Sequence, residues 1–186
     1  GKYALTPDTA VHNAEIIFLC LGNDKDVEEV VLAEHGILAG IKPSAIVVDH
    51  TTTSASLAKR LAVALSAQDC GFIDAPVSGG QQGALNGQLT VMCGGQLEYF
   101  GQVESAITCF AKAVQLMGPV GSGQLCKMVN QICIAGCSEH PGPHAHVDQL
   151  AIPRIHFLAG KQFECARPVH GSRNRVPGFG PQSARG

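Results

Sequence analysis

The feature of the sequence that most constrains the fold is an alternation between short apolar runs and longer segments with helical periodicity. The run Glu15–Leu21 (EIIFLCL) is almost continuously apolar, as in a parallel strand covered on both faces. The segment DKDVEEVVLAE then predicts a helix with Asp24 near its start. Because parallel strands need a crossover connection, which is usually a helix, this order indicates a sheet flanked by helices.

The same alternation continues over the next hundred residues. SAIVVDHT, after Pro43, predicts a second buried strand, and the helix TSASLAKRLAVALSAQD follows with Ser54 as its expected N-cap. GFIDAPV predicts a third strand, and LTVMCGG and AVQLMGPV predict two more, separated by the helix LEYFGQVESAITCFAKA. The predicted fold class is therefore α/β with a largely parallel sheet.

Length and charge exclude several classes of partner. The chain has 186 residues, enough for one domain or for one domain plus a fragment. A net charge of −2 argues against nucleic acid or a membrane surface as partner. No apolar stretch approaches the roughly 20 residues that span a bilayer. The N-terminus GKYALTPDTA is neither a signal peptide nor a basic transit peptide, so we expect a cytoplasmic protein.

The cysteines and histidines do not follow the spacing of a metal site. The eight cysteines form no C-x-x-C pair, and Cys20 sits inside an apolar run, so we expect reduced, mostly buried thiols. His140, His144 and His146 lie close together, but no carboxylates at helical spacing accompany them. We therefore expect no metal.

The composition changes near Gly136. Residues 1–136 carry 7 basic and 12 acidic groups, whereas residues 137–186 carry 6 basic and 3 acidic groups with six of the ten prolines. The second segment shows neither helical nor strand periodicity and is expected to be irregular. A disordered extension, a spliced or fused segment and an out-of-frame translation all explain it. We favour the last, because the change falls abruptly inside a predicted helix.

The stretch DAPVSGGQQGALNGQLTVMCGG holds six glycines, yet it contains neither G-K-[ST] nor G-x-G-x-x-G. The hydroxyl of Ser78 and the backbone N–H groups of Gly79 and Gly80 can point at one anion, because glycine lets an anion approach the backbone. The alternative is a strand-to-helix turn that needs glycine only for its dihedral angles.

Two segments resemble motifs of the β-hydroxyacid dehydrogenases, a family that includes 3-hydroxyisobutyrate dehydrogenase, tartronate semialdehyde reductase and, more distantly, 6-phosphogluconate dehydrogenase. DAPVSGGQQGALNGQL resembles the family's substrate-binding motif, and GSGQLCKMVNQ resembles its catalytic-lysine segment. LCLGNDKDVEEVV and VVDHTTTSASLAKRLA resemble later strands and loops of the cofactor domain. The resemblance covers about Thr6 to Gly136, with the motifs in the family's order.

The resemblance predicts how the chain is organised. Family members begin with a G-x-G-x-x-G strand–turn–helix unit and end with an all-helical domain entered through a long helix. We therefore expect a partial Rossmann-type NAD(P)-binding domain over residues 1–121 that lacks its first βαβ unit, and the start of the interdomain helix over residues 122–136. Residues 137–186 are the irregular tail. The choice between NAD and NADP stays open, as does the mitochondrial matrix as an alternative compartment.

The family reaction is reversible hydride transfer between a nicotinamide and a small β-hydroxy acid, and full-length relatives are expected to be homo-oligomers. The resemblance assigns substrate binding to Ser78, Gly79 and Gly80 and makes Lys127 the general acid/base. A lysine in an apolar helix, beside Leu125, Met128 and Val129, suits that role, because desolvation lowers its pKa. Asn130, one helical turn on, resembles the family's substrate-binding asparagine, and Gln131 stands where many members have a second asparagine. The hydroxy acid itself is not specified.

For the cofactor, Leu21 and Gly22 follow the first predicted strand, and ligands bind at the carboxyl ends of strands in such sheets. Many members have Leu-Pro at this point. Thr52 resembles a residue that contacts the nicotinamide half. The alternative for Thr51–Thr53 is a run that only caps the following helix. A non-catalytic remnant, or an interaction module built on the same sheet, stays open as the alternative function.

Overall fold

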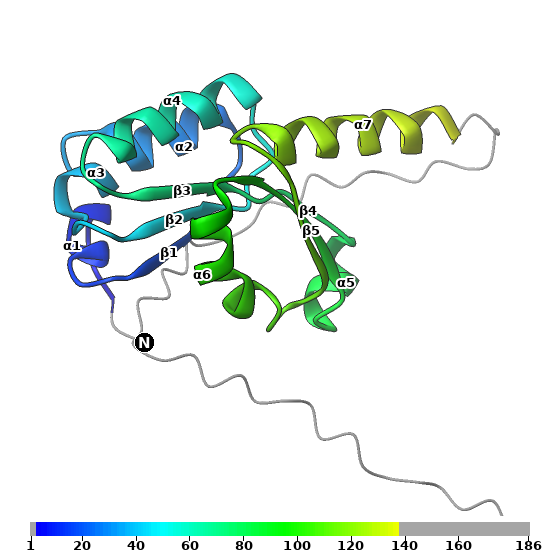
Figure 1. Ribbon diagram of the computed structural model, residues 1–186, viewed down its shortest axis with the longest axis horizontal. Coiled ribbons are helices and arrows are strands. Elements are labelled where there is room, and N and C mark those ends of the chain that lie inside the picture. The colour runs from blue at the N-terminus through cyan, green and yellow to red at the C-terminus, as the bar shows by residue number, and fades with distance from the viewer. Residues whose placement is uncertain (1–2, 138–186) are drawn as a thin grey trace, which may run out of the picture.

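The computed structural model describes residues 3–137 and forms a six-stranded sheet with helices on both faces (Figure 1). The strands are β1 (Ile16–Leu19), β2 (Ile46–Asp49), β3 (Gly71–Asp74), β4 (Val77–Ser78), β5 (Leu89–Gly95) and β6 (Ala111–Gly118). The helices are α1 (Pro7–Val11), α2 (Asp24–Leu32), α3 (Ile37–Gly40), α4 (Ala55–Ser66), α5 (Gly80–Leu85), α6 (Leu97–Ile107) and α7 (Ser122–Cys137). The irregular tail predicted for residues 137–186 lies, from residue 138 on, outside the described residues.

The sheet has a parallel half and a reversed half. Strands β1, β2 and β3 are parallel and adjacent, as predicted. β5 pairs antiparallel with β3 and β4, and β6 pairs parallel with β5. The reversal follows from the short connection through α5, because a parallel partner for β4 would need a longer crossover. The predicted α/β class with a mainly parallel sheet is confirmed.

The apolar strand runs are explained by burial on both faces. Val47 of β2 belongs to the cluster under α2 and α4, which includes Leu61. Its neighbour Val48 belongs to the cluster on the opposite face, where α6 contributes Phe100. Successive side chains of a strand point to opposite faces, so a strand covered on both sides has no polar alternation. The predicted cap of α4 is also present, since the Ser54 side chain accepts from the Leu57 N–H.

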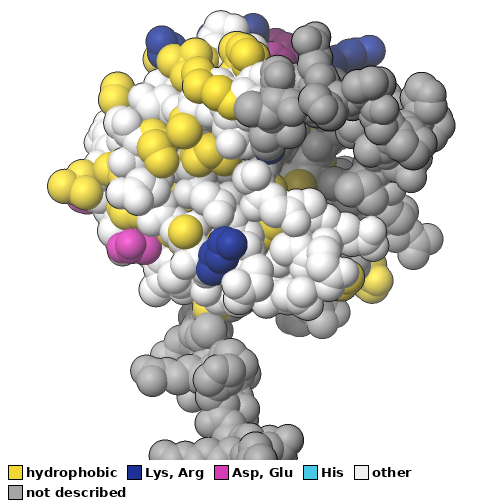
Figure 2. Space-filling model, turned by 90° about the vertical axis from the view of Figure 1, so that its right-hand side faces the viewer, with side chains coloured by type: hydrophobic (Ala, Val, Ile, Leu, Met, Phe, Trp, Pro, Cys, Tyr) yellow, Lys and Arg dark blue, Asp and Glu magenta, His cyan; other side chains and the backbone are white. Residues whose placement is uncertain are grey.

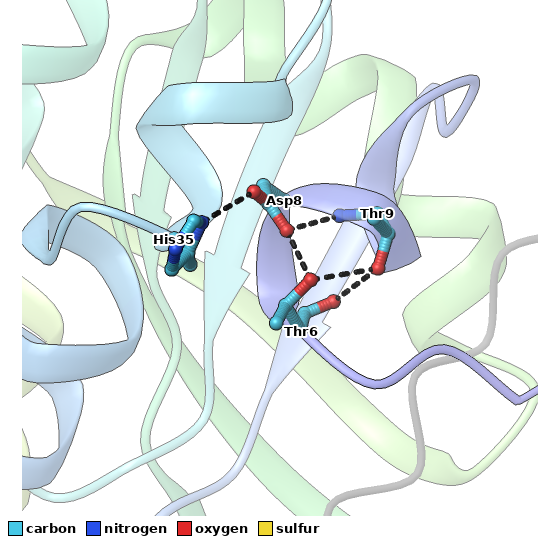
Figure 3. A network of polar contacts seen from close by, with 4 residues as sticks. All are labelled: Thr6, Asp8, Thr9 and His35. Carbon is cyan, nitrogen blue, oxygen red and sulfur yellow. Dashed lines mark hydrogen bonds and ion pairs between the residues drawn. The ribbon is translucent and has the colours of Figure 1, made fainter.

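The short helix α1 was not expected from periodicity, and a polar network holds it (Figure 3). The Asp8 carboxylate accepts from the Thr6 hydroxyl and from the Thr9 backbone N–H. Its other oxygen lies 3.3 Å from Nδ1 of His35, a residue just before α3. Proline in the first turn after Thr6 was the available sequence signal for a helix start. In Figure 1 the network lies at the end of the sheet away from α7.

The expectation of a buried Cys20 is wrong. β1 ends at Leu19, so Cys20 lies beyond the strand and is exposed, whereas Cys70 and Cys93 are buried as expected. None of the helices in the described part of the chain combines the length and apolar character needed to cross a membrane.

Helix α7 lies unusually close to the sheet, and Gly123 permits this. A Cβ at Gly123 would lie 2.3 Å from the backbone oxygen of Met92 and 2.8 Å from a carboxylate oxygen of Asp74. Backbone atoms cannot yield as the tip of a flexible side chain does. The first turn of α7 can therefore pack at this depth only without a side chain at position 123.

We expect Gly123→Ala to lower the free energy of unfolding by about 1–3 kcal/mol through overpacking. Gly101→Ala is the matched control, because Gly101 is also helical and a Cβ there meets no atom within 4 Å. Alanine at that site should raise stability by roughly 0.5–1 kcal/mol. Urea unfolding of the two variants measures both effects. A Gly123→Ala protein as stable as the parent would contradict the close packing of α7.

Candidate functional site

The candidate site lies where the three parallel strands end. Leu19, Asp49 and Asp74 close β1, β2 and β3 and are neighbours in register. Ligands of open α/β sheets bind outside these carboxyl ends. The N-terminal turn of α7 packs over the same edge, against β3 and β5 (Figure 1).

Asp74 fastens α7 to the end of β3. One carboxylate oxygen accepts from the Gly121 N–H at 2.7 Å, and the other accepts from the Gln124 N–H at 3.0 Å. The first N–H groups of a helix have no intrahelical partner, and the helix dipole favours a negative charge there. Burial raises the pKa of Asp74, while hydrogen bonds from backbone N–H groups oppose that rise. Those donors make the ionised carboxylate the form that suits this position.

The side chain of Gln124 joins the same helix to the loop after β2. Its Oε1 accepts from the Thr53 N–H at 2.9 Å, and its Nε2 donates to the Thr51 carbonyl at 2.7 Å. Only 1% of Gln124 is exposed. Thr52, between the two bonded residues, keeps its side chain exposed at the carboxyl end of the sheet.

The loops after β1 and β2 are also bonded to each other. The Thr51 hydroxyl accepts from the Leu21 N–H at 2.9 Å, and the Thr51 N–H donates to Asp49 at 2.9 Å. Ser54 caps α4, so the threonines before it do not. Capping therefore does not explain the run Thr51–Thr53. Thr51 and Thr53 are buried, and only Thr52 faces outward.

The predicted cofactor residues Leu21, Gly22 and Thr52 thus come from two loops that the structure brings together. Leu21 is half-buried, and Gly22 and Thr52 are exposed. An exposed hydroxyl and an exposed glycine backbone therefore lie at the carboxyl ends of parallel strands, where open α/β sheets bind their ligands. Among residues 3–137, no group of three or more His, Cys, Asp or Glu side chains is placed to hold a metal ion. His140, His144 and His146 lie outside the described residues.

Lys127 lies one helical turn beyond Gln124 on α7. Residues three apart are neighbours on a helix surface, so Lys127 lies next to Gln124 on α7. The side chain is half-buried, and this desolvation lowers its pKa. Asn130 is a further turn along, with its Nδ2 buried and without a hydrogen-bond partner in the described part of the chain. Gln131 is exposed.

The apolar neighbours of Lys127 in sequence are themselves only partly buried. Leu125, Met128 and Val129 are each about half exposed and lie with Ile132 along a different stripe of α7. Figure 2, which views the molecule from the right-hand side of Figure 1, shows hydrophobic side chains gathered on part of this surface. Burial nevertheless lowers the pKa of Lys127, in the direction expected from the sequence.

Ser78, Gly79 and Gly80 form the turn between β4 and α5. Ser78 pairs with Thr90 of β5, the strand against which α7 also packs. Gly79 and Gly80 have φ angles of 130° and 60°, which favour glycine. Both glycines are exposed, and a Cβ on Gly80 would meet nothing within 4 Å. Within the described residues no hydrogen bond links this turn to Lys127, and both β4 and α7 contact β5.

Asp49 was not expected to take part in the site. Its pKa is raised to about 6, chiefly by burial and in part by the charges of Asp74 and Asp24, while Thr51 opposes the shift. One of its carboxylate oxygens has no hydrogen-bond partner among the described residues. Both Asp49 and Asp74 directly end an apolar strand run, and that position was the signal available in the sequence.

We expect Asp49→Asn to gain stability relative to the parent as pH rises. The folded pKa of about 6 lies above the usual 3.8, so the folded protein holds this proton more tightly than the unfolded chain. The stability that protonated Asp49 contributes to the folded parent is complete below pH 4 and is lost as pH rises through 6. The difference between variant and parent should grow by up to about 3 kcal/mol between pH 4 and 7.

Urea unfolding across this pH range measures the difference. Asp69→Asn, at an exposed position where asparagine tolerates the positive φ, controls for the loss of one charge. A constant difference between the Asp49→Asn protein and the parent over the whole range would show that Asp49 titrates normally.

Comparison with known proteins identifies the family of this chain. Residues 1–118 match the family model of the NAD binding domain of 6-phosphogluconate dehydrogenase. An "Uncharacterized oxidoreductase" of Shewanella frigidimarina is 53% identical over 136 residues, which cover 73% of this chain and 47% of that protein. The 2-hydroxy-3-oxopropionate reductase of Escherichia coli is 35% identical over 122 residues, covering 66% and 42%. The mitochondrial 3-hydroxyisobutyrate dehydrogenase of Mus musculus is 33% identical over 134 residues, covering 72% and 40%.

Solved structures show the same fold. Psf3 in complex with NADP+ and 2-OPP aligns with a TM-score of 0.67 and 29% identity, covering 70% of this chain and 46% of that one. The 3-hydroxyisobutyrate dehydrogenase of Mycobacterium tuberculosis with L-serine aligns with a TM-score of 0.65 and 26% identity, covering 69% and 43%. The chain spans a little under half the length of the curated relatives it matches. On the family match and the shared fold, it belongs to the oxidoreductase family that carries the NAD binding domain of 6-phosphogluconate dehydrogenase and includes the 3-hydroxyisobutyrate dehydrogenases.

Proposed function

We propose that this chain forms the cofactor-side part of an NAD(P)-dependent β-hydroxyacid dehydrogenase. Its reaction is the reversible oxidation of a small, 3-hydroxyisobutyrate-like hydroxy acid, with Lys127 as general acid/base. The observation that carries the proposal is the position of Lys127. It is a half-buried lysine of lowered pKa on a helix that Asp74 and Gln124 fasten to the edge bearing Thr52.

The residues fall into two groups, one for the cofactor and one for the substrate. Leu21, Gly22 and Thr52 would hold the nicotinamide half of NAD(P), which when bound supplies the hydride chemistry. The Ser78 hydroxyl would donate a hydrogen bond to the substrate carboxylate, and the backbone N–H groups of Gly79 and Gly80 would add further donors. Support for this assignment is that both glycines are exposed and have positive φ angles, and that neither carries a Cβ that could block an anion.

Lys127 would handle the substrate proton. In the oxidation direction its neutral amine accepts the hydroxyl proton, and in the reduction direction its ammonium returns one. A lysine whose pKa lies nearer neutrality exchanges a proton more readily at physiological pH. Asn130 has a buried Nδ2 that finds no hydrogen-bond partner among residues 3–137, and it would donate to a substrate oxygen, while Gln131 would add a second amide.

We expect Lys127→Ala to lower kcat by about 10²–10⁴-fold with a smaller change in KM, because general acid–base catalysis contributes that much. Lys127→Arg should be similarly impaired, since a guanidinium keeps its proton. Lys112→Ala, at an exposed lysine of β6, is the control and should retain full activity. Initial rates with NAD+ and NADP+ on 3-hydroxyisobutyrate and 4-hydroxybutyrate measure the effect, as do NADH and NADPH with tartronate semialdehyde.

The oxidation rate of the parent should rise with pH through a pKa below 10.5, and Lys127→Ala should lack this limb. Unchanged turnover in Lys127→Ala would remove Lys127 from the mechanism. A folded full-length form of the protein that neither turns over these acids nor binds NAD(P) would favour a non-catalytic interaction module instead.

A further inference from the structure

Gln124 is a polar side chain among the largest fully buried side chains of the described residues. It carries no charge and no nucleophile, and it takes no part in the proposed proton and hydride transfers. A buried amide is stabilising only where its donor and acceptor are both paired, since an unpaired buried polar group destabilises the fold. Gln124 meets this condition through bonds to one short loop.

The geometry of these bonds resembles the pairing between two strands. Oε1 accepts from the N–H of Thr53 and Nε2 donates to the carbonyl of Thr51, so the amide faces the backbone on both sides of Thr52. The partners lie more than 70 residues before Gln124 in sequence. A two-point bond of this kind fixes both the distance and the orientation of the loop relative to α7.

The backbone of Gln124 is bonded to a second part of the sheet. Its backbone N–H donates to Asp74, which also accepts from Gly121. Gln124 is therefore bonded at once to the end of β3 and to the loop after β2. Lys127 follows three residues later on the same helix face.

We infer that Gln124 is a positioning residue that couples the Thr52 loop to Lys127, so that the nicotinamide-side loop and the acid/base move as one body. The inference deepens the proposed function and rests on its roles for Thr52 and Lys127. In hydride transfer the acceptor carbon and the proton-transfer group must be correctly placed together, and a misplacement of about 1 Å can cost 100-fold in rate. We call the two hydrogen bonds between the Gln124 amide and the backbone of Thr51 and Thr53 the clamp. The clamp supplies that placement without contacting the substrate.

Gln124→Met tests the clamp, because methionine is similar in length and lacks both hydrogen-bonding groups. Gln124→Asn is a second variant that keeps an amide but shortens its reach by one methylene. Gln102→Met, at an exposed glutamine of α6, is the matched control. Three properties of the full chain are measured: amide hydrogen exchange at Thr53, NMR titration of the Lys127 amine, and the separate values of kcat and KM.

In the Gln124 variants we expect Thr53 exchange to accelerate at least about tenfold while Val47 in β2 stays protected. The Lys127 pKa should rise toward its usual value as the helix turn loosens and water enters. kcat should fall by about 10- to 100-fold, with KM changed less than about threefold. The Asn variant should show the same pattern to a smaller extent, and it carries the test if the Met variant does not fold.

Unchanged Thr53 exchange together with an unchanged Lys127 titration would overturn the clamp, whatever the turnover. The first two measurements need neither cofactor nor substrate. An inactive parent would therefore contradict only the proposed function, whereas altered exchange and titration in the variants would still support the coupling.

Discussion

The hydrogen bonds between Asp74 and the N-terminal turn of α7 are the interaction on which the candidate site depends. A buried carboxylate at the end of β3 meets two backbone N–H groups at the positive end of a helix. Each partner satisfies the other in a place that water does not reach, since 0% of Asp74 is exposed. Because Lys127 and Asn130 lie further along the same helix, their positions relative to the sheet follow from this contact.

Close packing and hydrogen bonding reinforce each other at this point. The absence of a side chain at Gly123 lets α7 approach until Asp74 reaches the helix backbone. The approach also brings Gln124 within reach of the loop after β2, and Thr51 continues the connection to Leu21. The ends of β1, β2 and β3 and the start of α7 thus form one bonded unit, with Thr52 and Gly22 exposed at its rim.

The parts of the fold that could be predicted were those encoded locally. Apolar runs identified the strands, because strands covered on both faces need continuous apolar side chains. Ser54 identified the start of α4. The direction of β5 was not predictable in this way, since strand direction depends on how the intervening chain turns. The short helices α1, α3 and α5 span too few residues to show a period.

The residues of the candidate site also fall into those that the sequence predicts and those that only the folded chain reveals. Lys127, Ser78 and the glycines after it were expected through long motifs shared with a family. The roles of Asp74 and Gln124 depend on partners 47 to 73 residues away in sequence, and only the assembled fold brings them together. The partial exposure of Leu125, Met128 and Val129 likewise could not be predicted from the sequence, since exposure depends on tertiary packing.

The most direct test of this account is native-state amide exchange in Asp74→Asn. An asparagine offers one acceptor oxygen and turns an N–H donor toward the helix backbone, so one bond is lost and a repulsion is added. The account predicts that unfolding free energy falls by about 2–3 kcal/mol. It also predicts that the amides of Gln124 to Lys127 exchange much faster while β1, β2 and β3 remain protected. Unchanged protection across α7 would show that the helix is held by other contacts and would contradict the central role of Asp74.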